Sequence, residues 1–279
     1  MNASLRSLQA GLHEFLVFGL KEARACVFAG GFFLILVASK AVGIPGLARY
    51  DFILLMALLL QAGMLVFKLE TWDEAKVLLV FHAFGLGLEI FKTNPAIGSW
   101  SYPEPGLAKV FGVPLYSGFM YAAVASYLCQ AWRILDVELE REPDPKLSLA
   151  LAILIYLNFF THHFIPDLRW PLSAAVLLLF ARTRVAFTVT TFRRRMPVAL
   201  SFLLIGFFIW VAENLATAGG AWTYPGQRQG WRLVGFGKIH SWTLLVILSF
   251  VLVADLKRLK VRLGSALPEG AAEGGAGAE

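Results

Sequence analysis

Residues 89–103 read Glu-Ile-Phe-Lys-Thr-Asn-Pro-Ala-Ile-Gly-Ser-Trp-Ser-Tyr-Pro, and residues 213–225 read Glu-Asn-Leu-Ala-Thr-Ala-Gly-Gly-Ala-Trp-Thr-Tyr-Pro. Each copy places a Glu near the end of an apolar run and follows it with Gly-x-Trp-x-Tyr-Pro. The second Glu comes 124 residues after the first, and the second Trp comes 122 residues after the first. Because Trp and Tyr are scarce residues, this agreement predicts an internal repeat.

The composition around these two stretches is that of a membrane protein. The chain has 279 residues, 58% hydrophobic and 16% charged, against about 45–50% and 25% in soluble proteins. Mean hydropathy is +0.66, and several runs reach the roughly 20 apolar residues that cross a bilayer. The sequence therefore predicts an all-α polytopic bundle with the lipid bilayer as its partner. The first span would serve as the targeting signal, because no short apolar core with a cleavage site precedes it.

Net charge and cysteine content exclude other classes. In a membrane protein, a net charge of +6 marks the cytoplasmic face rather than a nucleic-acid partner. Cys26 and Cys129 are too few and too far apart for a disulfide framework or a metal motif, and they are interpreted as small packing residues. The sequence has no Walker or dinucleotide-binding motif and no GxSxG elbow. No cofactor is predicted.

The apolar runs predict about eight transmembrane helices. An amphipathic N-terminal segment, residues 1–24, precedes them and is expected to lie along the membrane surface. The expected spans are residues 25–44, 50–68, 74–91, 112–131, 147–164, 168–187, 197–217 and 239–256.

These helices divide into two four-helix repeats, residues 25–132 and 147–257, joined by a charged linker at 133–146. An even number of spans per repeat makes the two repeats parallel, so both motif loops emerge on the same face. Residues 258–279 form a basic tail, of which the Gly/Ala/Glu part from Gly264 onward cannot bury a core and is expected to be disordered.

Charge bias gives the orientation. Roughly two thirds of the 25 Lys and Arg residues fall in segments that are inside when the N-terminus is inside. Among them, the run at residues 193–195 is interpreted as a topology determinant, with binding of anionic lipid as the alternative. The prediction is a multi-pass protein of the bacterial cytoplasmic membrane with both termini in the cytoplasm.

Ionisable residues inside membrane helices are candidates for function, because burying them there costs roughly 2.5–3.5 kcal/mol. Glu89 and Glu213 lie about one turn from the outer helix ends, and the repeat would bring them near a common axis. His82 lies two turns before Glu89 on the same helix face. Alternatively, Glu89 is a structural carboxylate paired with Lys92, one turn further on.

The remaining polar and aromatic candidates gather at the same outer level. His162, His163 and His240 are weak metal candidates, since imidazole and carboxylate suit Zn or Fe, although packing is the alternative for each. The aromatics either anchor the chain at the interface or wall a pocket formed by re-entrant turns. The aromatic candidates are Trp100, Tyr102, Trp222 and Tyr224. Further polar candidates are Asn94, Tyr116, Asn158, Asn214 and Lys238.

The residues from Phe67 through Lys76, with His82, Glu89 and Gly98-Ser-Trp-Ser-Tyr-Pro103, resemble an uncharacterised family of bacterial integral membrane proteins, domain of unknown function 817. That resemblance covers nearly the whole chain and implies a polytopic membrane fold without an activity.

A second resemblance rests on Glu89, the Gly98–Tyr102 turn and Gly112-Val-Pro-Leu115. These residues are similar to a motif of carotenoid hydratases and membrane lycopene cyclases. It implies acid–base chemistry on polyene ends, with only Glu89 and the turn carried over. This chain departs from their Gly-x-Tyr-x-Tyr and lacks their Thr-Gly turn.

Three functions follow as hypotheses. The first is an enzyme that performs acid–base carboxylate chemistry on a lipophilic, isoprenoid-like substrate from the outer leaflet, with Glu89 as acid or base, His82 as its proton partner and Glu213 as second acid or orienter. The second is a transporter or binding protein for a small molecule or lipid, and the third is a metal-dependent membrane hydrolase. Because Gly206 and Ala216 stand where the first copy has His82 and Lys92, any chemistry is expected on the first copy. The predicted substrate-binding residues are Trp100, Tyr102, Trp222, Tyr224, Lys92 and Asn214.

Overall fold

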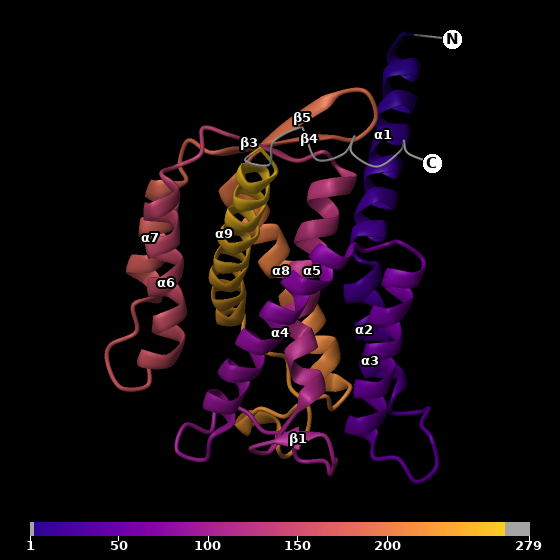
Figure 1. Ribbon diagram of the computed structural model, residues 1–279, viewed down its shortest axis with the longest axis vertical. Coiled ribbons are helices and arrows are strands. Elements are labelled where there is room, and N and C mark those ends of the chain that lie inside the picture. Colours follow the sequence, from indigo (N-terminus) through magenta and orange to yellow (C-terminus); the bar gives the residue numbers. More distant parts are fainter. Residues whose placement is uncertain (1–2, 266–279) are drawn as a thin grey trace, which may run out of the picture.

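The structure, a computed structural model that describes residues 3–265, is mostly helical (Figure 1). One long N-terminal helix leads into a bundle whose members run up and down beside one another. The helices are α1 (Ala3–Ala25), α2 (Val27–Ala38), α3 (Arg49–Val66), α4 (Trp72–Thr93), α5 (Gly118–Ile134), α6 (Pro145–Thr161), α7 (Arg169–Leu179), α8 (Val198–Ala218) and α9 (Gly237–Ser265).

Every expected span contains a helix, but the helices differ in their capacity to cross a membrane. Three are long and apolar enough within the described residues, namely Arg49–Val66, Val198–Ala218 and Gly237–Arg258. Four others, α2, α5, α6 and α7, have 17 residues or fewer. The 22-residue α4 is long enough, but it carries five charged residues: Asp73, Glu74, Lys76, Glu89 and Lys92.

Local sequence explains where the helices begin. At the start of α4, Glu74 N–H donates to the Thr71 hydroxyl at 3.2 Å, and the Thr71 N–H donates back to the Glu74 carboxylate at 2.8 Å. This reciprocal pair satisfies two free donors of the first turn. At the start of α6, the Asp144 side chain accepts from the Lys146 N–H at 2.7 Å, and Pro145 takes the first helical position. Both helices therefore have fixed starting points.

Two helix pairs pack especially closely because glycines lie at their contacts. In the pair α4–α5, Gly85 lies against the Tyr121 side chain and Gly118 lies against His82. In the pair α8–α9, Gly206 lies against Thr243, including its backbone. A Cβ atom at any of these glycines would come within 3.0 Å of its neighbour. The absence of side chains there is what lets the paired helices approach.

The prediction of a helix over 168–187 is wrong in its last part. Helix α7 ends at Leu179, and the chain then forms β4 (Arg184–Thr188) and β5 (Arg193–Pro197). With β3 (Glu138–Glu140), which falls inside the expected linker, they make an antiparallel sheet in the order β3-β4-β5. β-Branched and aromatic residues fill 185–192, and such residues favour strands. The apolar run misled the helix prediction because periodicity does not separate short buried strands from helices.

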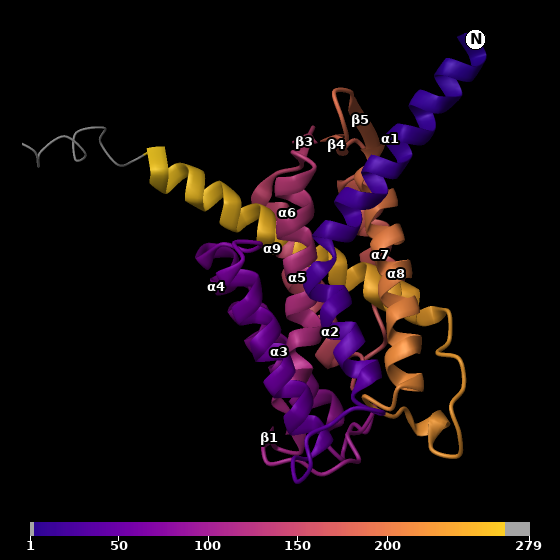
Figure 2. The same ribbon diagram turned by 90° about the vertical axis from the view of Figure 1, so that its right-hand side faces the viewer.

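The sheet caps one end of the bundle and holds α1 there (Figures 1 and 2). Lys21 donates to the Thr188 carbonyl at 3.0 Å, and Arg194 pairs with Glu14. The neighbouring arginines of β5 pair with β3, Arg193 with Glu138 and Arg195 with Glu140. All three members of the arginine run therefore have carboxylate partners.

Other boundaries also differ from expectation. The helix expected from residue 112 begins at Gly118, because a hairpin of β1 (Lys109–Val110) and β2 (Val113–Pro114) precedes it. Phe111 and Gly112 turn this hairpin with φ of 50° and 83°, which suits a turn with two left-handed residues. Helix α9 continues to Ser265 instead of ending near 256, in keeping with the strong helix propensity of Leu, Lys and Arg. Most of the expected disordered tail, from residue 266, lies outside the described residues.

Candidate functional site

The two Gly-x-Trp-x-Tyr-Pro loops meet at the end of the bundle opposite the three-stranded sheet, the end where Figure 1 labels β1. Ser101 and Thr223 form an antiparallel bridge, each donating its N–H to the other's carbonyl at 3.0 Å. Two segments more than a hundred residues apart are thus joined at the same position of their motifs. The sequence prediction that both loops lie on one face of the bundle fits this arrangement.

Glu89, in the last turns of α4, is buried with 2% of its surface exposed and accepts three hydrogen bonds. Trp100 Nε1 and the Tyr102 hydroxyl each donate to Oε2 at 2.7 Å, and the Tyr121 hydroxyl donates to Oε1 at 2.8 Å. The motif loop supplies the first two donors, and α5 supplies the third. All three groups are donors, and together they fix the position of the Glu89 carboxylate.

Glu213, in the last turns of α8, has a matching environment and is also 2% exposed. The Tyr224 hydroxyl donates to its Oε1 at 2.5 Å, and Trp242 Nε1 donates to its Oε2 at 2.8 Å. Again one donor comes from the motif loop and one from the following helix. The second copy therefore holds its carboxylate with a phenol and an indole.

Both motif tyrosines remain protonated donors. Burial, followed by the nearby Glu89, raises the pKa of Tyr102 well above its usual value. Burial and the Glu213 carboxylate do the same to the pKa of Tyr224. Each phenol is therefore a fixed donor to its carboxylate rather than a group that titrates near neutral pH.

Lys238, at the start of α9, lies between the two copies. Its Nζ donates to the Tyr224 hydroxyl at 3.1 Å, and it lies 4.6 Å from the centroid of the Tyr224 ring and 5.3 Å from that of Trp100. The two rings contact each other edge to face with centroids 6.0 Å apart. The ammonium also interacts electrostatically with both Glu89 and Glu213. One ammonium group is therefore linked to both carboxylates, to Glu89 through Trp100 and to Glu213 through Tyr224.

Cationic and aromatic side chains from the first half of the chain fix the second loop. Arg49 donates to the carbonyls of Gly219 at 2.6 Å and Gly220 at 3.1 Å, and Lys40 donates to Ala218 O at 3.0 Å. These carbonyls belong to the C-terminus of α8, where positive charge is favourable. The Tyr116 hydroxyl donates to Ala221 O at 2.5 Å. The loop conformation therefore depends on contacts across the bundle.

The expected pairing of Glu89 with Lys92 is wrong. Lys92 is 5% exposed, and its Nζ contacts His163 Nε2 at 2.8 Å and His162 Nε2 at 3.4 Å. One helical turn separates the two side chains in the sequence, but the carboxylate turns toward the aromatic donors and the lysine toward α6. Lys92 thus belongs to a separate cluster with the two histidines.

The other sequence candidates are dispersed. The expected hydrogen bond of His82 with Glu89 is not formed: the His82 ring packs against Phe119 with centroids 4.6 Å apart, and its Nδ1 is buried without a partner. His240 Nε2 bonds to the Ser173 hydroxyl. Asn214 donates to Trp210 O and accepts from Val234 N–H, each at 2.8 Å, so it anchors the chain after the second loop.

Trp222 also has a packing role, since it is 6% exposed and forms part of the hydrophobic core. Of the predicted substrate-binding residues, Trp100 and Tyr224 lie at Lys238, and Tyr102 lies on Glu89. The two motif tryptophans therefore have different environments: Trp100 lies at Lys238, and Trp222 packs in the hydrophobic core.

The metal candidates do not converge. Within the described residues, no three His, Cys, Asp or Glu side chains are placed to share a metal ion. His162 and His163 face Lys92, a donor that repels a metal cation, and His240 contacts α7 instead.

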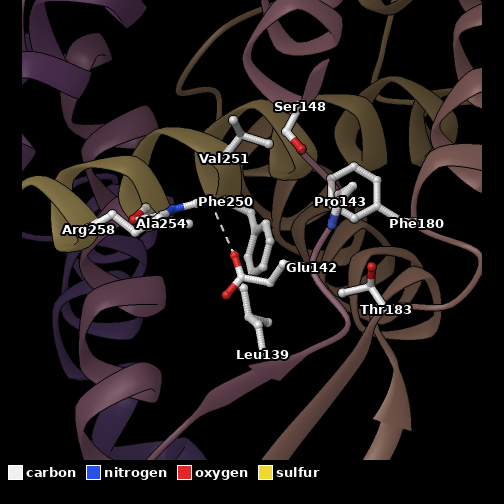
Figure 3. Close-up of a pocket in the computed structure, with 10 residues that line it drawn as sticks. All are labelled: Leu139, Glu142, Pro143, Ser148, Phe180, Thr183, Phe250, Val251, Ala254 and Arg258. Atoms are coloured by element: carbon white, nitrogen blue, oxygen red, sulfur yellow. Dashed lines mark hydrogen bonds and ion pairs between the residues drawn. The ribbon is translucent and has the colours of Figure 1, made fainter. Parts of the chain in front are cut away.

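A small hollow lies at the sheet end of the bundle, lined by residues that include Leu139 of β3, Phe250 of α9 and Phe180, which follows α7, with Glu142 paired to Arg258 (Figure 3). Its volume of about 10 Å³ suffices for roughly one water molecule. It is remote from both carboxylates and adds nothing to their site.

Sequence reasoning missed Tyr121 and Trp242, the donors supplied by α5 and α9. They are 121 residues apart, close to the spacing of the two motifs, and this is the signal that could have revealed them. The two residues are not of the same type: where the first copy has a Tyr, the second has a Trp. Both can donate one hydrogen bond from an aromatic ring.

The family of this chain follows from its sequence as a whole. Residues 14–250 match the family described as "Protein of unknown function (DUF817)", and the chain belongs to it. It is 55% identical over 243 residues to "Uncharacterized protein YoaT" of Bacillus subtilis (strain 168), which covers 87% of this chain and 91% of that relative. No solved structure matches significantly. The family membership predicted from the motif is confirmed, whereas the similarity to carotenoid hydratases and lycopene cyclases finds no support in these matches.

The bridge between the loops predicts a disulfide. Residues that exchange two hydrogen bonds across antiparallel chains have Cα atoms about 5.5 Å apart, within the range that a disulfide spans. We expect the double variant Ser101→Cys, Thr223→Cys to cross-link under mild oxidation, which would be read as a reducible change of electrophoretic mobility. Each single variant serves as a control for Cys26 and Cys129. Four free thiols after oxidation of the folded double variant, the introduced pair together with Cys26 and Cys129, would contradict the pairing of the loops.

Proposed function

We propose that this chain is a multi-pass carrier of the bacterial cytoplasmic membrane, built from two parallel four-helix repeats that bind a small solute at the paired Glu89 and Glu213 sites. The observation that carries the proposal is the position of Lys238. Its ammonium lies on Trp100 from one half of the chain and on Tyr224 from the other, between two buried carboxylates. A charged site at the interface of two repeats is the usual location of the substrate in such carriers.

Exposed apolar side chains support the placement of the bundle in lipid. Helices α3, α4, α6, α7 and α8 each leave at least one large hydrophobic side chain half or more exposed: Leu58, Phe84, Leu154, Leu178 and Phe208. A soluble protein rarely leaves so many apolar groups in water over one surface. The shorter helices among these would then pass through the membrane with protein on one side and lipid on the other.

Equivalent contacts support the repeat. The pair α4–α5 and the pair α8–α9 each carry a buried Glu, a motif loop that donates to it, and an aromatic donor on the second helix. Counted from residues 25–132 and 147–257, these features fall at corresponding places. Charge bias supports an orientation with both termini in the cytoplasm and both loops on the outer side.

The alternative of an acid–base enzyme acting on an isoprenoid-like substrate gains less from the geometry. Protonation of a polyene requires the Glu89 carboxyl group to reach the substrate, yet it is 2% exposed and three donors occupy its oxygens. His82 is not bonded to it and is placed against Phe119. A metal-dependent hydrolase gains no support either, because the described histidines do not converge.

The test uses purified protein in two formats. Thermal stability is first measured against a panel of amines, carboxylates, sugars and prenyl lipids, and stabilising compounds are then offered to proteoliposomes. We expect a compound to accumulate chemically unchanged, with uptake lost in both Glu89→Gln and Glu213→Gln.

Two results would overturn the carrier proposal. One is recovery of a chemically altered prenyl lipid that depends on Glu89, which would favour the enzyme. The other is a wild-type protein that neither responds to the panel nor takes up any member of it.

A further inference from the structure

The surroundings of the Lys238 ammonium are those of a ligand site for a cation. Two aromatic faces, Trp100 and Tyr224, lie within about 6 Å of Nζ, the range in which a ring attracts a cation. The ammonium also donates to one hydroxyl, that of Tyr224, at 3.1 Å. Such cages of aromatic rings recognise organic ammonium ions in proteins.

The carboxylates strengthen this cage through the rings. Trp100 donates its indole N–H to Glu89, and Tyr224 donates its hydroxyl to Glu213. A ring that donates to an anion is polarised toward greater electron density, which favours a cation on its face. The two buried carboxyl groups therefore act on the cation through the aromatic groups.

Charge balance indicates what the cage requires. Lys238 lies on the two rings that donate to Glu89 and Glu213. The neighbouring cations are engaged elsewhere, since Arg169 is paired with Asp167 at 2.5 Å and Lys92 is held by two imidazoles. If Lys238 left, the two rings would lose their cation, and one monovalent cation would replace it.

Lys238 is also able to leave. It is the second residue of α9, adjacent to the loop 225–236, and its side chain is only partly buried. The tether is a flexible four-carbon chain. By contrast, the carboxylates and both rings are fixed by the contacts described above.

We propose that the cage formed by Trp100 and Tyr224 between Glu89 and Glu213 binds an organic ammonium ion, whose place the Lys238 ammonium occupies in this structure and from which a substrate amine displaces it. The assignment deepens the proposed carrier function, on which it rests for the route of entry. It names the substrate class as small cationic amines. The lysine would neutralise the empty site while the carrier returns without substrate.

The experiment removes the tethered cation and supplies a free one. In Lys238→Ala, we expect n-butylammonium to raise the thermal midpoint saturably and to quench tryptophan fluorescence. Its half-saturating concentration should be roughly tenfold lower than in the wild type, where Lys238 competes; tenfold corresponds to about 1.4 kcal/mol, within the range of a cation–π contact. n-Butanol, butyrate and NaCl at equal concentration should have no such effect. Adding Glu213→Gln to the variant should weaken the response.

Matched variants make the result specific. Lys40→Ala removes another lysine at the same end of the molecule, one that donates to a carbonyl, and should gain no response to n-butylammonium. Lys238→Met keeps the aliphatic stem and serves if the alanine variant does not fold. If neither variant folds, the wild type is titrated with n-butylammonium, and the proposal then requires a saturable response of the wild type.

The proposal is overturned if folded Lys238→Ala or Lys238→Met shows no saturable response, or if n-butanol and NaCl act as strongly as the amine. This failure is distinct from failure of the carrier function. A wild-type protein that takes up an anionic or neutral solute would support the carrier function and exclude amines as its substrates. One that binds n-butylammonium without any uptake would support the ammonium cage and exclude transport.

Discussion

Glu89→Ala is expected to lower the free energy of unfolding by about 3 kcal/mol or more, because each buried donor left without a partner costs about 1–3 kcal/mol. Three donors converge on this carboxylate, from Trp100, Tyr102 and Tyr121. All three would face an apolar cavity after the truncation. Thermal or denaturant-induced unfolding in detergent, followed by tryptophan fluorescence, measures the loss.

Glu89→Gln is the matched control for shape. It keeps the volume and one carbonyl acceptor, but it replaces the other acceptor with an amide that donates. Its loss should lie between those of the wild type and the alanine variant. Glu213→Ala should lose less than Glu89→Ala, since it abandons two donors. Equal stability of Glu89→Ala and the wild type would show that the three donors find water or other partners.

Gly85→Ala and Gly87→Ala are expected to change stability in opposite directions, although the two glycines are two residues apart on α4. A Cβ atom at Gly85 would lie 2.3–2.7 Å from Cδ2, Cγ and Cβ of Tyr121, whereas a Cβ at Gly87 would have no atom within 4 Å. Contacts this short force α4 and α5 apart, and overpacking of this kind costs about 1–3 kcal/mol. Gly87→Ala should instead gain up to about 1 kcal/mol from helix propensity.

The Gly85 variant should also affect the site. Tyr121 donates to Glu89 at 2.8 Å, and its displacement would remove one of the three hydrogen bonds. The melting midpoints of the two alanine variants, measured side by side, give the comparison. A Gly85→Ala protein at least as stable as Gly87→Ala would show that the α4–α5 contact can adjust without a loss of stability.

The doubled motif carried most of what the sequence could predict about the site. It identified Glu89 and Glu213 and put both loops on one face. It also named Trp100, Tyr102 and Tyr224, and Lys238 was a further polar candidate at the same level. Apolar runs located helices α2 to α9, because length and hydropathy are local properties of the chain, and the amphipathic N-terminal segment contains α1.

The errors arose where a partner comes from a distant segment. Lys92 follows Glu89 by one turn, but its imidazole partners lie on the α6 side of the bundle. His82 shares a face with Glu89, yet Phe119 and Gly118 occupy its surroundings. The strands β4 and β5 were missed because β3, their partner, lies in a segment that charge alone marked as a linker. No local pattern contains this information.

A single lysine serves two carboxylates, and this constrains how the two halves of the chain could have arisen. A chain made by joining two copies of one gene begins with the same residue at both equivalent positions. At the spacing of 121 residues that relates Tyr121 to Trp242, the counterpart of Lys238 is Ser117, which is fully buried. Two lysines on one axis would place like charges in a shared cage, so only one copy could have acquired an ammonium group. Under the proposed repeat, the difference between the two copies at this position is therefore a condition for the arrangement.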